Sequence, residues 1–257
     1  MSDIQSVLDL LQDFSEKNTI QIFIPSLNRE VGFKLITGAQ QKRIYETGYD
    51  NVVFRTKFII ATYDIIVENC LEPDITNEFN VIDRLSILLS YRKALYGSAF
   101  ESSFGKSDIF ESIERVKTSG NRVTEQQFEY NGIKVTTQIP KIDNQYKFEK
   151  ELREQTVLEK KEVKNFIQAF GEMYIGEVCK TIKTLIVADN VIDFKQLNVQ
   201  EQIAIVEKLP VQIVNLIGSY IKTIIALQTD ILTVKAIKED VETDIMINID
   251  TEFLISG

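Results

Sequence analysis

Few residue types in this sequence are suited to catalysis at neutral pH. The 257 residues include no His and no Trp, so the commonest general base and the commonest metal-binding side chain are absent. The two cysteines, Cys70 and Cys179, lie far apart in the chain, and two thiols provide at most half of a four-coordinate zinc site. Neither thiol has an imidazole to activate it as a nucleophile. We therefore expect reduced thiols within helical segments of the core, and no structural zinc site.

One short motif is similar to part of a nucleotide-binding loop. Gly105-Lys106-Ser107 matches the end of a phosphate-binding loop, but Phe100 stands where that motif requires its first glycine. No apolar strand precedes the segment either. The sequence predicts an exposed loop here rather than a nucleotide site.

Clustered carboxylates are the other candidate chemical groups. Glu68, Glu72, Asp74 and Glu78 lie close together in the sequence, yet they lack the alternating oxygen ligands and the glycine of a calcium-binding loop. Other neighbouring carboxylates are Glu239, Asp240, Asp244 and Asp250. Ionised, solvated carboxylates are the default in such places. We expect no catalytic, cofactor-binding or metal-binding residue, and we expect that the protein is not an enzyme.

The overall composition favours a globular, helix-rich protein. Hydrophobic residues make up 44% of the chain, and Gly and Pro are scarce, which is typical of long helices rather than of many tight turns. The formal net charge of -9 argues against nucleic acid as a partner, because phosphate binding needs a surplus of Lys and Arg. The first residues, MSDIQSVLDLLQDF, lack the basic start of a signal peptide. Polar residues interrupt the apolar stretch 211–227, so we expect no membrane as a partner.

The spacing of apolar residues predicts most of the helices. Helical periodicity extends over residues 3–16, 37–72, 80–96, 146–187, 199–208 and 210–227. The region that begins at Thr37 has a candidate break at Gly48, and residues 146–187 form either one helix or two. The Ser- and Gly-rich segment 97–120 is expected to be a loop or a loose helix.

Alternating apolar residues predict β-structure in three places. Two hairpins are expected, and Asn131-Gly132 in the second supplies the positive φ angles of a type I′ turn. A further strand runs from Ile245 to Ile255, with a partner strand around Val234. The predicted fold class is α+β, mainly α-helical, with β-hairpins near residues 19–36 and 122–140 and a C-terminal strand pair.

The C-terminal strand is a candidate protein interface. A strand with one apolar face must either cover the core of its own chain or extend a sheet in a neighbour. Pairing within the chain is favoured, and both outcomes stay open. The residues expected at an interface are Ile245, Ile247, Ile249, Phe253, Tyr130 and Ile133. A soft boundary near residue 140 divides the chain into domains of residues 1–140 and 141–257, unless the chain forms one domain.

Several stretches of the sequence resemble one protein family. IPSLNREVGFKLITGAQQKRIYE, FNVIDRLSILLSYRKALYGS, VEKLPVQIVNLIGSYIKTIIAL and DIMINIDTEFLIS are similar to segments of the baseplate hub proteins of T-even-type tailed phages. The resemblance implies a non-catalytic component of a contractile tail baseplate, synthesised in the host cytoplasm and located in the virion. It implies other baseplate or tail proteins as partners. Some relatives carry a Cys pair before the last strand; Leu232–Thr243 has none, which puts a metal-clamped module in doubt.

Three functions stay open at this point. The first is a structural baseplate subunit that stays in the particle, and the second is a transient assembly chaperone that is absent from the mature virion. A stoichiometric band in purified virions separates these two. The third is a metal- or nucleotide-dependent enzyme that uses carboxylates and Lys106, and an unchanged Lys106→Ala variant without a ligand-induced melting shift would remove it. The sequence fixes neither copy number nor homo-oligomerisation.

Overall fold

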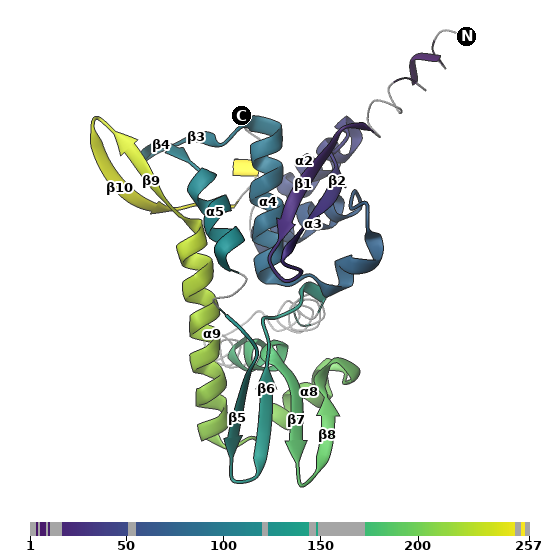
Figure 1. Ribbon diagram of the computed structural model, residues 1–257, viewed down its shortest axis with the longest axis vertical. Coiled ribbons are helices and arrows are strands. Elements are labelled where there is room, and N and C mark those ends of the chain that lie inside the picture. Colours follow the sequence, from purple (N-terminus) through teal and green to yellow (C-terminus); the bar gives the residue numbers. More distant parts are fainter. Residues whose placement is uncertain are drawn as a thin grey trace. The chain divides into compact units, whose positions relative to one another are not determined.

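A computed structural model describes residues 17–50, 55–119, 123–143 and 173–249, with the isolated positions 4, 6–8, 10, 148, 253 and 254. Figure 1 shows an α+β chain, and its described residues form three small antiparallel sheets. The predicted fold class is therefore confirmed. Residues 4, 6–8 and 10 are helical, as predicted for residues 3–16. The rest of that helix, and residues 146, 147 and 149–172 of the helix predicted over 146–187, lie outside the described residues.

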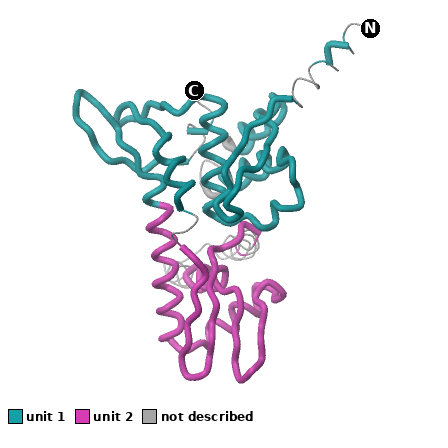
Figure 2. Tube along the Cα trace, viewed as in Figure 1, with its two compact units in different colours: residues 1–120, 229–257 teal, residues 121–228 magenta. Residues whose placement is uncertain are grey.

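The chain divides into two compact units (Figure 2). Unit 1 comprises residues 1–120 and 229–257, and unit 2 comprises residues 121–228. Unit 2 is therefore inserted between two segments of unit 1 in the sequence. The expected boundary near residue 140 falls inside unit 2, and it stays a prediction of where independently folding domains meet.

Unit 1 contains the predicted N-terminal hairpin, which is confirmed. β1 (Thr19–Ile24) pairs with β2 (Arg29–Lys34) in antiparallel register. Successive side chains of a strand face opposite sides, so one side of the hairpin faces the core. The buried residues of the hairpin are Ile22, Ile24, Val31 and Phe33.

Two helices follow the hairpin, and the second ends earlier than predicted. α2 (Gly38–Asp50) begins after Thr37, whose hydroxyl accepts a hydrogen bond from the Gln40 N–H in a capping box. α3 (Arg55–Val67) stops before Pro73, because residues 69–71 leave the helix and bond to β2. Pro73 instead begins a 3-10 helix, η1 (Pro73–Glu78).

α4 (Val81–Tyr96) lies where the sequence predicts a helix and is buried on several sides. The Asn80 side chain accepts hydrogen bonds from the N–H groups of Ile82 and Asp83, and the Asp83 carboxylate accepts one from the Asn80 N–H at 2.7 Å. This reciprocal capping fixes the start of the helix. The wholly buried residues of α4 include Ile87, Leu88 and Leu89.

The second sheet of unit 1 joins segments that are far apart in the sequence. In sheet order its strands are β10 (Val241–Met246), β9 (Thr233–Lys238), β4 (Gly105–Asp108) and β3 (Ala99–Ser102). Helix α5 (Phe110–Ser119) follows β4. The loop or loose helix expected over residues 97–120 is therefore wrong. β3 and β4 are only four residues long. Their sheet is completed by β9, which is far away in the sequence, so local patterns do not reveal it.

The closing strand begins and ends earlier than predicted. Alternation predicted a strand from Ile245 to Ile255, but β10 ends at Met246. One more ladder bond runs from the Ile247 N–H to the Leu232 carbonyl at 2.7 Å. Residues 247–249 are not in a strand, and residues 253 and 254 are helical. The alternation of apolar residues continues past the strand because Ile247 and Ile249 are buried, although neither belongs to a strand.

Unit 2 contains a four-stranded antiparallel sheet. In sheet order its strands are β5 (Gln126–Tyr130), β6 (Ile133–Thr137), β7 (Ile182–Val187) and β8 (Asn190–Asp193). The hairpin predicted near residues 122–140 is confirmed. Asn131 and Gly132 have φ angles of 49° and 78°, as the two central residues of a type I′ turn require.

The helix predicted over residues 146–187 is wrong at its end. Residues 173–181 are helical, but β7 begins at Ile182. Ile182 and Leu185 fit helical spacing, whereas the β-branched residues around them fit a strand. Pairing with β6, in which Val135 lies opposite Leu185, favours the strand.

Helices complete unit 2. The 3-10 helix η2 (Phe194–Gln196) leads to α8 (Val199–Val206), and Pro210 precedes α9 (Val211–Leu232). The predicted helices over residues 199–208 and 210–227 are confirmed, although α9 continues to Leu232. By length and composition α9 is apolar enough to cross a membrane. Its buried positions include Ile213 and Ile217, which belong to the core of unit 2.

Candidate interaction site

The six residues expected at an interface fall into two groups. Ile245, Ile247, Ile249 and Phe253 belong to unit 1, and Tyr130 and Ile133 belong to unit 2. Ile247 and Ile249 are only 2% and 3% exposed, and Ile245 is half-buried. The strand that carries Ile245 pairs within the chain, with β9. Tyr130 and Ile133 face each other across the hairpin and pack, half-buried, on the core of unit 2.

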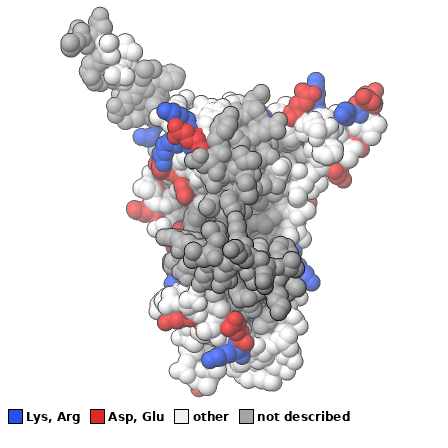
Figure 3. Space-filling model, turned by 180° about the vertical axis from the view of Figure 1, so that it is seen from behind, with Lys and Arg blue, Asp and Glu red and all other residues white. Residues whose placement is uncertain are grey.

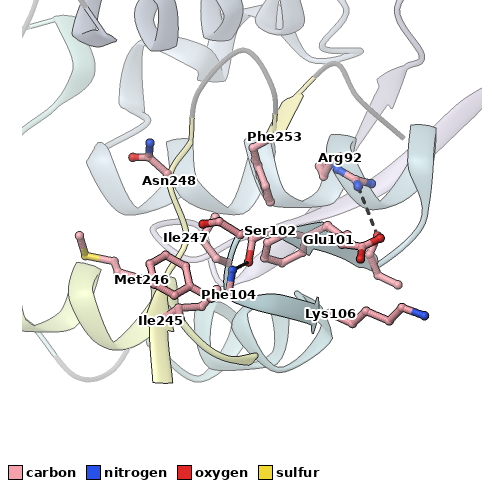
Figure 4. Close-up of a pocket in the computed structure, with 13 residues that line it drawn as sticks. Arg92, Glu101, Ser102, Phe104, Lys106, Ile245, Met246, Ile247, Asn248 and Phe253 are labelled. Atoms are coloured by element: carbon pink, nitrogen blue, oxygen red, sulfur yellow. Dashed lines mark hydrogen bonds between the residues drawn. The ribbon is translucent and has the colours of Figure 1, made fainter. Parts of the chain in front are cut away.

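A hollow of about 770 Å³ lies beside the end of β10 (Figure 4). Its apolar lining consists mainly of Phe100, Phe104, Phe253, Ile245, Met246 and Ile247. In Figure 4, Phe253 lies on one side of the hollow and Ile245 and Met246 lie on the other. The Phe253 ring meets the Phe100 ring edge-on, with the ring centroids 5.5 Å apart. Phe104 and Met246 are 61% and 62% exposed, so the hollow opens beside apolar surface.

Arg92 places a buried cation beside the hollow. Its side chain donates hydrogen bonds to the carbonyl oxygens of Gly97 at 2.8 Å and Ala99 at 3.3 Å. The guanidinium lies over the rings of Tyr96 and Phe253, 5.2 and 5.7 Å from their centroids. Burial lowers the pKa of Arg92. Because these contacts join α4 to β3, Arg92 holds the β3–β4 hairpin in place rather than presenting a charge to solvent.

The register of β9 and β10 fixes which backbone groups bond within this hairpin. Lys238 and Val241 face each other across a two-residue turn. In such a hairpin the flanking pair exchanges hydrogen bonds, and bonded pairs then alternate with non-bonded pairs. Counted from Lys238 and Val241, this alternation makes Leu232 and Ile247 a bonded pair, and the hydrogen bond from the Ile247 N–H to the Leu232 carbonyl agrees with it. The backbone groups of residues 241, 243 and 245 therefore point toward β9.

The other residues of β10 turn their backbone groups outward. These residues are Glu242, Asp244 and Met246. β10 is an edge of its sheet, with no strand beyond it among the described residues. Figure 1 shows the yellow β9–β10 hairpin projecting past β4, with which β9 pairs only at Ile237 and Ala236. Among the residues that the structure describes, no strand pairs with these outward N–H and C=O groups, which form a short pairing edge.

The projecting hairpin carries an excess of acid. Its charged residues are the acids Glu239, Asp240, Glu242 and Asp244 and the bases Lys235 and Lys238. Both bases have partners, since Lys235 forms an ion pair with Glu242 and the Lys238 ammonium donates to the Ser103 carbonyl at 3.2 Å. Seen from behind, charges of both signs lie side by side in this region (Figure 3).

The motif Gly105-Lys106-Ser107 does not form the exposed loop that the sequence predicts. These residues lie in β4, between β3 and β9. A strand that pairs on both sides cannot offer the curved row of N–H groups that holds a phosphate. Lys106 lies opposite Ile237 in β9, and in Figure 4 its side chain extends away from Ile245 and Met246.

Two members of the acidic cluster are engaged in ion pairs. Glu72 accepts two hydrogen bonds from Arg29 at 2.6 and 2.8 Å, and Glu68 accepts two from Arg43 at 2.8 Å. These hydrogen bonds lower the pKa of Glu72 and of Glu68. Among the described residues there is no group of three or more His, Cys, Asp or Glu side chains placed to hold a metal ion.

The two cysteines are free thiols, as predicted, and both are buried. Cys179 lies within the helical residues 173–181, whereas Cys70 lies outside a helix, opposite Phe33 of β2. Burial raises the pKa of the Cys179 thiol to about 12. A thiol with so high a pKa is a poor nucleophile at neutral pH.

Comparison of the chain with protein-family models, with curated proteins and with solved structures finds no significant match. The resemblance to baseplate hub proteins therefore stays a prediction from the quoted stretches.

Proposed function

We propose that this chain is a non-enzymatic structural component of a contractile phage tail baseplate, in the hub region, and that it acts by binding other baseplate proteins. The observation that carries the proposal is the projecting β9–β10 hairpin, with an unpaired edge among the described residues and exposed apolar side chains. Those side chains are Ile237, Val241 and Met246, each more than half exposed. Apolar groups on a projecting edge are typical of surfaces that dock to other proteins.

The resemblance supplies the identity of the proposed partners. Its first stretch covers the β1–β2 turn, β2 and most of α2, and its second stretch folds as α4. Its Pro-containing stretch folds as the end of α8 and most of α9. Elements of this kind suit a subunit that folds by itself and then docks to its neighbours.

The alternative within the same system is a transient assembly chaperone that is absent from the mature virion. Both versions use the same binding surface, so the distinction lies in the particle. We would quantify the 29.5 kDa chain in purified tails and in tail-assembly intermediates. A fixed number of copies per tail supports the structural subunit, and presence in intermediates alone supports the chaperone. Absence from both would contradict the proposal.

A metal- or nucleotide-dependent enzyme built around Lys106 is the rival of a different class. We expect Lys106→Ala to leave stability and tail association unchanged, because Lys106 lies on a paired strand rather than in a phosphate loop. Neither Mg²⁺ nor ATP should shift the melting temperature of the wild-type chain. A clear melting shift that the Lys106→Ala variant loses would favour the enzyme instead.

A further inference from the structure

We infer that the outward edge of β10 receives an extended, basic segment of a partner protein, which adds a strand to this sheet. The inference rests on the proposed function, because it takes the partner to be another tail protein.

The backbone of β10 supplies the pairing groups. Unpaired N–H and C=O groups along a strand edge are a template for another strand. In the described part of the chain such groups come from Glu242, Asp244 and Met246, which are alternate residues of one strand. In an antiparallel pair these three residues would each exchange hydrogen bonds with a residue directly opposite. An extended segment of about five residues satisfies all of them.

The side chains select a basic segment. Glu242, Asp244 and Met246 project from the same face of β10. Lys235 of β9 offsets one of the two acids through its ion pair with Glu242, which leaves one net negative charge beside this edge. Opposite charges directly across a strand pair stabilise it. An antiparallel segment would therefore place an apolar residue opposite Met246 and basic residues opposite Asp244 and Glu242. Its sequence pattern is apolar-x-basic-x-basic. The apolar residue would lie next to the hollow that Met246 helps to line.

The same charges disfavour a second copy of this chain at the edge. Two β10 strands paired about Asp244 would place this carboxylate opposite its own copy, and a register shift of two residues would place Glu242 opposite Asp244. The register of β3 turns the backbone groups of Glu101 outward at the other edge of the sheet, so that edge is acidic as well. Like charges directly opposite are destabilising, and a basic partner avoids them.

Two matched peptides test the inference with the full chain. The first has the sequence Thr-Leu-Thr-Lys-Thr-Lys-Thr, and the second replaces both Lys by Glu. Each carries a fluorescent label, and binding is followed by anisotropy at low and high salt. We expect the Lys peptide to bind at least about tenfold more tightly at low salt, with a smaller ratio at high salt. Equal binding of the two peptides, or no binding of either, would overturn the inference.

Hydrogen exchange locates the bound peptide on the chain. The outward N–H groups of Glu242, Asp244 and Met246 should exchange quickly in the free chain and more slowly with the Lys peptide bound. The inward N–H groups of β10 are already bonded to β9, so their exchange should change less. Protection elsewhere, without slowing at these three residues, would place the peptide at another site and overturn the inference.

Variants separate the edge from the rest of the molecule. Asp244→Pro removes an outward N–H and a carboxylate but leaves the ladder with β9 intact, because proline is tolerated at an outward position of an edge strand. It should weaken Lys-peptide binding at least about tenfold. Glu101→Pro makes the same change at the opposite edge and should bind as the wild type does. Asp244→Lys keeps the backbone group and should reduce the preference for the Lys peptide.

The outcomes keep this inference distinct from the proposed function. If Asp244→Pro enters tails and binds the Lys peptide as the wild type does, strand addition at β10 is wrong and the baseplate role stands. If the wild-type chain is found in neither tails nor intermediates, the baseplate role is wrong whatever the peptides do.

Discussion

Gly105 adopts a backbone conformation that few other residues tolerate. Its φ angle is 116°, and a Cβ at this position would lie 2.3 Å from the carbonyl oxygen of Ile237. No side chain larger than hydrogen fits there unless β4 moves away from β9. The contact explains why a glycine stands at the start of β4, where the sequence by itself suggested part of a phosphate loop.

Gly105→Ala should therefore destabilise the sheet of unit 1. We expect a loss of about 1–3 kcal/mol in the free energy of unfolding, measured by urea denaturation. Gly38→Ala is the control, because a Cβ on Gly38 meets no atom within 4 Å and the residue begins α2. That variant should be as stable as the wild type or slightly more stable. Equal stability of the Gly105→Ala variant and the wild type would show that β4 does not approach β9 so closely.

Cys179 should behave as an inert thiol in the folded chain. It is 1% exposed, and burial raises its pKa to about 12 from the ordinary 9.0. At pH 8 we expect its reaction with a water-soluble thiol reagent to be at least about a hundredfold slower than in the unfolded chain. A Cys70→Ala background isolates the signal of Cys179. Rapid reaction without unfolding would contradict the buried position.

The same pKa shift makes the stability of the folded chain depend on pH in the alkaline range. Because the folded pKa lies above the unfolded one, the unfolded chain releases its proton first as the pH rises. The contribution of Cys179 is therefore fully present below pH 9 and is lost as the pH rises from 9.0 to about 12. Across this pH range the free energy of unfolding should decline less steeply for Cys179→Ala than for the wild type. Parallel declines would exclude the effect.

At the scale of the element, local hydrogen bonds fix where helices begin. Asn80 and Asn198 each form a capping box, with Asp83 at the start of α4 and with Glu201 at the start of α8. They differ in environment, since Asn80 is 9% exposed and Asn198 is exposed to solvent. The pair therefore allows the same cap to be compared in a buried and in an exposed place.

We expect Asn80→Ala to cost about 1–2 kcal/mol of unfolding free energy and Asn198→Ala about 0.5–1 kcal/mol. The buried cap costs more because its loss leaves N–H groups that water cannot reach. Urea denaturation followed by circular dichroism measures both variants. An equal or smaller cost at Asn80 would show that the start of α4 does not depend on this cap.

Elements with local signals could be predicted from the sequence, and elements with distant partners could not. Asn131-Gly132 specified its hairpin through the turn itself, and helix α4 followed from its apolar spacing. Residues 99–108 gave no comparable signal, because β3 and β4 are short and their sheet is completed by β9. β7 falls within a predicted helix because Ile182 and Leu185 satisfy both periodicities, and pairing with β6 favours the strand.

At the scale of the whole molecule, unit 1 is built from both ends of the described chain. Unit 2 interrupts it in the sequence, and no change in composition marks either crossing. Apolar residues named from the sequence, such as Ile245 and Phe253, do line the hollow. The outward edge of β10 does not follow from the sequence analysis, which interprets Asp244 as a solvated surface charge and does not single out Glu242. The turn of the β9–β10 hairpin is also hard to recognise in the sequence. Its two residues, Glu239 and Asp240, both have positive φ, but neither is a glycine, the residue that usually indicates such a turn.

The central claim is that this molecule works by binding other proteins, and its mass in a native extract tests this most directly. The untagged chain would be followed by sedimentation of the lysate in which it is naturally made, with its co-sedimenting proteins identified. We predict that it sediments in complexes much larger than its own 29.5 kDa, together with tail proteins. Sedimentation as a lone 29.5 kDa species at every stage of particle assembly would contradict the account.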